Sequence, residues 1–500
     1  MRKRQRSTTM INVISSFLLQ ICQIVSAFIV PKIIISYFGS EVNGLIGTLT
    51  QLLSYISLIE GGITSVIAAS LYRPLHNNDT KRVSEILKTS TGFFRKIGFF
   101  YILYALLLAI VYPFCSKTNF DFWYISSITL ILSTSLLIQY TMSLSAKTLL
   151  TADKKVYVVS FVQIIIVVTS TISAILSVKI YPDIHILKLI TGFLYILQPI
   201  FFNAYIKKHY KINKNAKKNN ELLKQRWDGF AVNIAAFIHN STDIVILSIF
   251  TNLETVSVYT TYALVTTGIR SIIQSIARGI TPTLGHSLAS NDTKKINSIF
   301  DSFELVIFTL TSILFSTAAL LIVPFVKIYT NNVADANYDQ PLFAILLIIS
   351  EICYLLREHH VALSYSANKF KEITKPCITE AIINIVVSLV LVPNFGLIGV
   401  AIGTIIAMLY RTIYHVFYTK KLIGRPLSKF FSNAITFSCG SIIGIIISNF
   451  VIKTQASSFI DLIYHGIIYI VIISASVLLV LLIFKNKKIR NIKNNLIRKK

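Results

Sequence analysis

Ionisable side chains stand inside several long apolar runs of this sequence. If such a run crosses a bilayer, each charge near its centre costs about 2.5–3.5 kcal/mol. A charge that is kept at this cost is expected to pair with another charge, to bind a ligand or to couple transport to an ion. The candidates are the acids Glu60, Asp243 and Glu351 and the arginines Arg270, Arg278 and Arg357.

The arginines indicate an anionic ligand. Arginine keeps its charge at all working pH values, and its planar fork matches the oxygens of a phosphate. Arg270, Gln274 and Arg278 recur every four residues, so they share one face of a helix. Arg278 has an equally plausible role as a residue near a helix end whose long side chain extends to the interface.

The remaining candidates each have a structural alternative. Arg357 could form a salt bridge to Glu351, Glu358 or Asp243. Glu60 stands beside two glycines and could be paired or bonded to a loop. His239 and Asp243 are four residues apart and share a helix face. His359 and His360 point about 100° apart on a helix, which favours a polar helix end over a metal site.

Composition identifies the class of protein. Of 500 residues, 54% are hydrophobic and only 14% are charged, whereas soluble domains have about 25% charged residues. The net charge of +27 is spread over short loops rather than over one soluble domain, which argues against nucleic acid as a partner. The five cysteines lack metal-binding spacing and are expected to pack in the core. The basic N-terminus precedes an apolar run without a cleavage site, so we expect an uncleaved first span.

The apolar runs predict an all-α polytopic membrane protein with about 14 transmembrane helices. Lysine and arginine accumulate on the cytoplasmic side of a membrane. With the N-terminus placed inside, 42 of the 48 lysines and arginines fall on the cytoplasmic side. Both termini are therefore predicted to be cytoplasmic. The predicted spans are 11–36, 43–70, 91–113, 122–146, 155–178, 185–205, 229–250, 256–284, 302–326, 341–365, 376–393, 396–418, 430–450 and 462–484.

A near repeat suggests how the helices are organised. NDTKR at 78–82 and NDTKK at 291–295 both follow a predicted span on the cytoplasmic side. Glu41 and Glu254 have the same separation of 213 residues, which favours a duplicated six-span unit in parallel orientation. The alternative is that Asn-Asp-Thr simply caps a helix. We expect a six-helix bundle over 1–206, a basic cytoplasmic linker over 207–228, a second six-helix bundle over 229–420, and two extra helices with a basic tail over 421–500.

Three segments carry a resemblance to a known family. They are the tip YFGSEVNG at 37–44, IEGGITS at 59–65 with Glu60, and HNSTDIVIL at 239–247 with Asp243. Together with fourteen spans arranged as six, six and two, they resemble the polysaccharide transporters (Wzx-like oligosaccharide flippases). These belong to the multidrug/oligosaccharidyl-lipid/polysaccharide exporter superfamily. The resemblance covers most of the chain through degenerate motifs.

The resemblance implies a flippase in the bacterial cytoplasmic membrane. Its substrate would be an undecaprenyl-diphosphate-linked oligosaccharide used for capsule, exopolysaccharide or O-antigen. Its other partners would be membrane lipids, and a polymerase and glycosyltransferases of the same pathway. Arg270 and Arg357 would bind the diphosphate, with Arg278 at the cytoplasmic mouth. Glu60, Asp243 or Glu351 would add proton or sodium coupling.

Other functions remain open at this stage. Lipid II flippases also have fourteen spans, whereas multidrug antiporters usually have twelve. A glycosyltransferase or polymerase would need a substantial outer loop, and the longest one, 327–340, carries Asp335 and Asp339 without a paired-acid signature. The chain has no GxxxxGK[ST] phosphate loop, so we expect no ATP hydrolysis. For a transporter we also expect no cofactor, no metal site and no catalytic residues. GVAIG at 399–403 and GSIIG at 440–444 are patterns that let helices pack closely.

Overall fold

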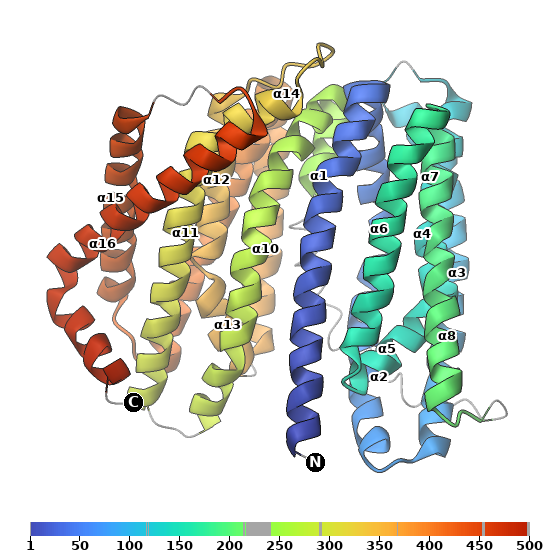
Figure 1. Ribbon diagram of the computed structural model, residues 1–500, viewed down its shortest axis with the longest axis horizontal. Coiled ribbons are helices and arrows are strands. Elements are labelled where there is room, and N and C mark those ends of the chain that lie inside the picture. The colour runs from blue at the N-terminus through green and yellow to red at the C-terminus, as the bar shows by residue number, and fades with distance from the viewer. Residues whose placement is uncertain are drawn as a thin grey trace. The chain divides into compact units, whose positions relative to one another are not determined.

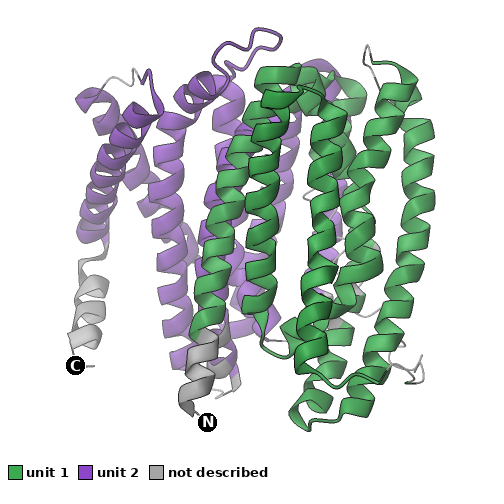
Figure 2. Ribbon diagram, turned by 45° about the vertical axis from the view of Figure 1, so that its right-hand side comes forward, with its two compact units in different colours: residues 1–257 green, residues 258–500 purple. Residues whose placement is uncertain are grey.

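Helices make up the regular structure of the chain. The computed structural model describes residues 2–116, 118, 120–213, 216, 242–289, 293–367, 369–452 and 456–497, and no strand occurs in these ranges (Figure 1). The chain divides into two compact units, Met1–Ser257 and Val258–Lys500 (Figure 2). The expectation of an all-α membrane protein is confirmed.

The first unit holds the helices up to the start of α10. A π-helix, Gln139–Ser143, joins α4 to α5, and a 3-10 turn, Leu194–Ile196, joins α7 to α8. Residues 242–250 are also helical. The numbered helices are α1 (Arg2–Ser54), α2 (Ser57–His76), α3 (Thr80–Cys115), α4 (Phe122–Ile138), α5 (Leu144–Ala152), α6 (Val156–Ile180), α7 (Ile184–Phe193) and α8 (Leu197–His209).

The second unit contains most of α10 and all later helices. Its last two helices, α15 and α16, pack on each other and on α11. The bounds are α10 (Leu253–Ala289), α11 (Thr293–Tyr329), α12 (Pro341–Leu355), α13 (Glu358–Ser366), α14 (Phe370–Ile423), α15 (Leu427–Val451) and α16 (Phe459–Ile497).

The described part of the chain contains nine helical segments that are long and apolar enough to cross a membrane. Two of them are broken by a glycine with a positive φ angle, Gly39 (88°) in α1 and Gly396 (51°) in α14. The chain reverses around Gly396. The two halves of α14 lie side by side, as shown by the hydrogen bond from the Asn384 side-chain amide to Thr404 Oγ1 at 3.0 Å. The hairpin tip predicted at 393–396 is therefore confirmed. The chain is a multi-pass membrane protein.

The first compact unit extends to Ser257. One contact within it is the hydrogen bond that the Asn43 side-chain amide donates to Ser257 Oγ at 2.8 Å. Leu253 also packs into the same apolar core as Val42 and Leu45. Most of the expected linker and the start of the expected seventh span, with His239, lie outside the described residues. The division into two six-helix bundles stays a prediction.

The pentapeptide at 78–82 begins a helix. The Asp79 carboxylate accepts a hydrogen bond from the Arg82 amide at 2.9 Å, and α3 starts at Thr80. The second copy lies where α11 starts, at Thr293, while Asn291 and Asp292 lie outside the described residues. Capping therefore explains the first copy, and both copies precede a helix of similar length. These facts agree with a duplication, which stays a prediction.

Candidate functional site

Charged side chains gather inside the second unit around one aromatic ring. Helix α10 places Arg270 beside Glu351 of α12, with Nη1 3.1 Å from the carboxylate. The Arg270 guanidinium also lies 5.1 Å from the centre of the Tyr354 ring. Gln274, one turn along α10, donates to the Tyr354 hydroxyl at 3.1 Å. The face shared by Arg270 and Gln274 is therefore directed at α12.

Arg357 stands in the break between α12 and α13. Its guanidinium lies 4.4 Å from the centre of the same Tyr354 ring. Arg357 is only 2% exposed, so this guanidinium is shielded from solvent. Its Nη1 is 2.9 Å from Glu380 of α14. Arg411, also on α14, forms a second ion pair with Glu380, which is fully buried. Arg357 thus has the ion-pair role considered above, with a partner that the sequence did not suggest.

We call these six residues, Arg270, Glu351, Tyr354, Arg357, Glu380 and Arg411, the arginine cluster. It contains three arginines and two carboxylates. Each arginine has an acidic partner, but Arg357 and Arg411 share Glu380, so the positive charges outnumber the carboxylates by one. Within the described chain, Arg411 Nε and both nitrogens of buried His415 also lack a hydrogen-bond partner. A low-dielectric site with surplus positive charge and unused donors favours an anion.

The arginines differ in how far their side chains are exposed, and this decides which of them can contact a ligand. The Arg270 side chain is 21% exposed and can reach a ligand, whereas Arg357 and Arg411 are closed in by their partners. Arg278 is exposed on α10 and forms no ion pair with a described residue. This placement fits either of the two roles expected for Arg278.

The acids of the first unit lie apart from this cluster in the chain. Glu60 is half-buried in α2, where Thr64 Oγ1 donates to its carboxylate at 3.4 Å. Asp243 is 9% exposed and lies close to Tyr55. Glu351 belongs to the second unit, so the three acids proposed for ion coupling do not share one unit.

A second buried network, here called the histidine cluster, comprises Asp301, Glu304, His359, Arg425 and Asn433. The Glu304 carboxylate accepts hydrogen bonds from Arg425 at 2.8 Å and from Asn433, and His359 Nε2 lies 3.2 Å away. Arg425 also pairs with Asp301 at 3.1 Å. His359 lies in the first turn of α13 and is fully buried.

The histidine cluster resembles a structural network more closely than a metal site. His359, His360 and Glu304 offer three ligand atoms within 4.8 Å of one another. However, Glu304 already accepts from a guanidinium and an amide, and the positive charge of Arg425 opposes a cation. His360 Nδ1 instead lies 2.7 Å from Thr419 Oγ1.

Sequence reasoning missed seven residues of these two clusters: Tyr354, Glu380, Arg411, Asp301, Glu304, Arg425 and Asn433. Glu380 and Arg411 lie in the eleventh and twelfth predicted spans, and Glu304 lies in the ninth. The signal was present, since each is a charge within an apolar run. Arg425 gives no such signal, because it stands among the basic residues expected at a cytoplasmic loop.

Comparison with known proteins shows what fold this arrangement belongs to. No protein-family model and no curated protein matches the chain. The solved structure of the lipid II flippase MurJ in an inward closed conformation has a TM-score of 0.71 at 18% identity, over 93% of this chain and 98% of that one.

Transporters of a second group are also similar. An inward-facing multidrug resistance MATE family transporter of the MOP superfamily has a TM-score of 0.63 at 13% identity, over 81% of this chain and 96% of that one. The MATE multidrug transporter DinF-BH in complex with R6G has a TM-score of 0.63 at 15% identity, over 84% and 96% of the two chains. At such identities the likeness establishes the fold alone.

Proposed function

We propose that this protein is a flippase that moves an undecaprenyl-diphosphate-linked oligosaccharide across the cytoplasmic membrane by alternating access. A lipid diphosphate carries roughly two negative charges and cannot cross hydrocarbon alone, so it needs a cationic site within the membrane. The observation that carries the proposal is the surplus positive charge of the arginine cluster, whose most exposed arginine is Arg270.

Arg270 is the first contact for the diphosphate in this proposal. It is held by one carboxylate, Glu351, so an arriving diphosphate competes with that carboxylate for the guanidinium. Exchange of one anionic partner for another costs less than desolvating a free arginine. Arg278 guides the headgroup from the exposed end of the same helix face, and Arg357 positions Tyr354 from the buried side. Glu351, once released from Arg270, is the acid best placed to take up a coupling proton; Glu60 and Asp243 stay candidates in the first unit.

Two further candidate functions rest on the structural neighbours. A lipid II-type flippase fits the same cationic site and the fold shared with MurJ. A multidrug or ion antiporter fits the fold shared with the MATE transporters. The positive charge of the arginine cluster argues against an antiporter for cationic drugs, because it repels a cation.

The test is genetic complementation in the host with a chemical readout. In a deletion strain, surface polysaccharide and the lipid-linked pool are measured after complementation with wild type, Arg270→Ala, Arg270→Lys or the exposed control Arg73→Ala. We expect Arg270→Ala to lose polymer and to accumulate full-length, cytoplasm-facing lipid-linked repeat units, with partial rescue by lysine and full rescue by the control.

Other outcomes identify the competing functions. Normal polymer from membrane-inserted Arg270→Ala contradicts the assignment of the site. Truncated repeat units in the deletion strain indicate a glycosyltransferase. Unchanged polymer with greater sensitivity to dyes indicates an antiporter, and loss of cell-wall synthesis indicates lipid II.

A further inference from the structure

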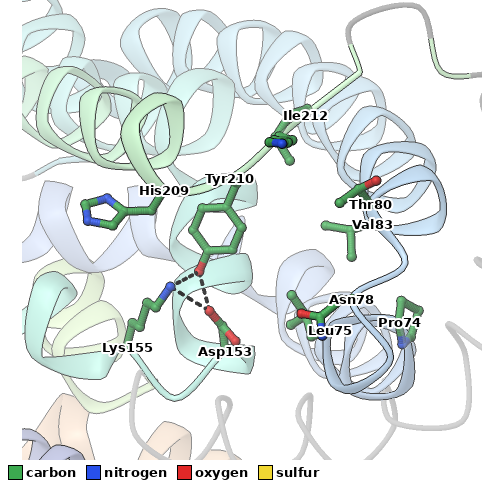
Figure 3. Close-up of a pocket in the computed structure, with 11 residues that line it drawn as sticks. Pro74, Leu75, Asn78, Thr80, Val83, Asp153, Lys155, His209, Tyr210 and Ile212 are labelled. Atoms are coloured by element: carbon green, nitrogen blue, oxygen red, sulfur yellow. Dashed lines mark hydrogen bonds and ion pairs between the residues drawn. The ribbon is translucent and has the colours of Figure 1, made fainter.

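The segment Tyr210–Asn213, here called the strap, crosses one end of the first unit after α8. The Tyr210 hydroxyl donates to Asp153 at 2.5 Å and accepts from Lys155 at 3.1 Å, as Figure 3 shows. Burial, together with the Asp153 carboxylate, raises the pKa of Tyr210, so its hydroxyl keeps the donated proton. At the other end of the strap, the backbone N–H of Asn213 donates to Ser84 Oγ at 2.9 Å.

The strap lies between two pockets of different charge. The first, of about 360 Å³, is the one drawn in Figure 3 and contains Lys155. Lys155 is neutralised there by Asp153, whose carboxylate is 2.9 Å away. Lys211 lines this pocket as well as the second one. The two pockets differ in that the first also has an acidic side chain, Asp153, in its lining.

The second pocket, of about 590 Å³, is strongly basic. It is lined by Arg95 of α3, Lys207 of α8 and Lys211 of the strap, and by no acidic side chain. All three cations are exposed, and none forms an ion pair within the described chain. Thr91 and Asn203 add polar groups to the same lining. Three cations from three elements that converge without a counter-charge favour a bound anion.

Apolar side chains continue from this pocket along the helices that form it. Met142 lines the pocket and is 60% exposed. Phe99, one turn beyond Arg95 on α3, is also 60% exposed. Both α3 and the α7–α8 segment are long and apolar enough to cross a membrane. The pocket therefore combines a cationic end with an exposed apolar flank on a helix that is able to cross a membrane.

We propose that this second pocket binds the phosphodiester headgroup of an anionic membrane phospholipid. The phosphate would lie among Arg95, Lys207 and Lys211, and the acyl chains would extend along Met142 and Phe99. The apolar flank favours a lipid over a soluble phosphate ester, which would gain nothing from it. The Asn12 side chain accepts from the Tyr157 amide at 2.9 Å, which places this end of α6 with the N-terminus, on the side predicted to be cytoplasmic. The site is independent of the arginine cluster, which belongs to the second unit.

Lipid binding by the purified full-length protein tests this proposal. Delipidated protein in detergent is titrated with phosphatidylglycerol or phosphatidylcholine, and bound lipid is counted by native mass spectrometry. The test variant carries Arg95→Gln, Lys207→Gln and Lys211→Gln. The matched control carries Lys81→Gln, Lys96→Gln and Lys208→Gln, which remove the same charge from exposed lysines that line neither pocket.

We expect wild type and control to bind phosphatidylglycerol in preference to phosphatidylcholine. The test variant is expected to bind phosphatidylglycerol more weakly by roughly fivefold for each cation removed, since a basic residue near an anionic lipid surface contributes about that factor. An equal loss of phosphatidylglycerol binding in the test and control variants would contradict the assignment of the site to this pocket. Displacement of the lipid by an equal concentration of soluble glycerol phosphate would overturn the lipid in favour of a simple anion. Thermal unfolding of each variant checks that it is folded.

Discussion

At the scale of single residues, Glu380 holds the arginine cluster together. It is fully buried and pairs with both Arg357 and Arg411. A buried ion pair adds little net stability over an apolar replacement of the same volume, but removal of one partner leaves an uncompensated charge. Here two charges depend on the same carboxylate, so it is the most sensitive position of the cluster.

Glu380→Gln is expected to lower the free energy of unfolding by about 3–5 kcal/mol, because both guanidinium groups then lack a counter-charge. The measurement is thermal unfolding of the detergent-purified protein. Asp339→Asn is the control, since the Asp339–Lys327 pair has side chains that are 52% and 56% exposed and is worth about 1 kcal/mol or less. Similar losses in the two variants would contradict the central role of Glu380.

The sequence predicted members of the candidate site but not their pairing. Arg270, Arg357 and Glu351 were recognised because a charge in an apolar run is costly. Glu380 as the partner of Arg357 could not be derived, because helical periodicity describes one helix at a time. Which face meets which neighbour depends on packing across α12, α13 and α14. For the same reason the sequence could not show that His359 is buried against Glu304.

At the scale of helices, close packing depends on glycine at a few positions. A Cβ atom at Gly399 would lie 2.7 Å from the Leu391 carbonyl carbon, inside the hairpin of α14. A Cβ at Gly440 of α15 would lie 2.9 Å from Val477 Cα of α16. Both glycine patterns that the sequence marked as packing sites are therefore confirmed as places where helices approach closely.

Gly399→Ala is expected to destabilise the protein by about 1–3 kcal/mol, because the added methyl group meets backbone atoms that cannot move aside cheaply. Gly268→Ala is the matched control. Gly268 also lies within a helix, but its Cβ would meet no atom within 4 Å, so alanine there is expected to be neutral or to stabilise by about 0.5–1 kcal/mol. Unfolding temperatures of the two variants should move apart; a shared shift would refute the packing argument.

At the scale of the whole molecule, the distribution of basic residues predicts the orientation in the membrane. The sequence predicted the helical class and the hairpin tip at Gly396 because both follow from local patterns, apolar length in one case and Pro-Asn-Phe-Gly in the other. The boundary between the compact units could not be predicted from local sequence patterns. It follows from contacts of Ser257 and Leu253 with residues near Asn43, about two hundred positions earlier in the chain.

Orientation can be tested by cysteine labelling in intact cells with a membrane-impermeant maleimide. Native Cys115 is exposed and is first replaced by serine, since it is predicted to lie near the outer surface. In that background Asn331→Cys is expected to react from outside, whereas Asn77→Cys should react only after the membrane is opened. Both positions are exposed in the folded chain. The reverse pattern would invert the topology.

The shared carboxylate of Glu380 also has a consequence for biogenesis. Arg357 lies 23 residues before Glu380, and Arg411 lies 31 residues after it. While the chain is being synthesised, α12 and Arg357 therefore leave the ribosome before Glu380, the acid that neutralises Arg357. The segment that contains Arg357 should be retained at the translocon until the first half of α14 has followed, so that the helices enter the lipid together as one electrically balanced group.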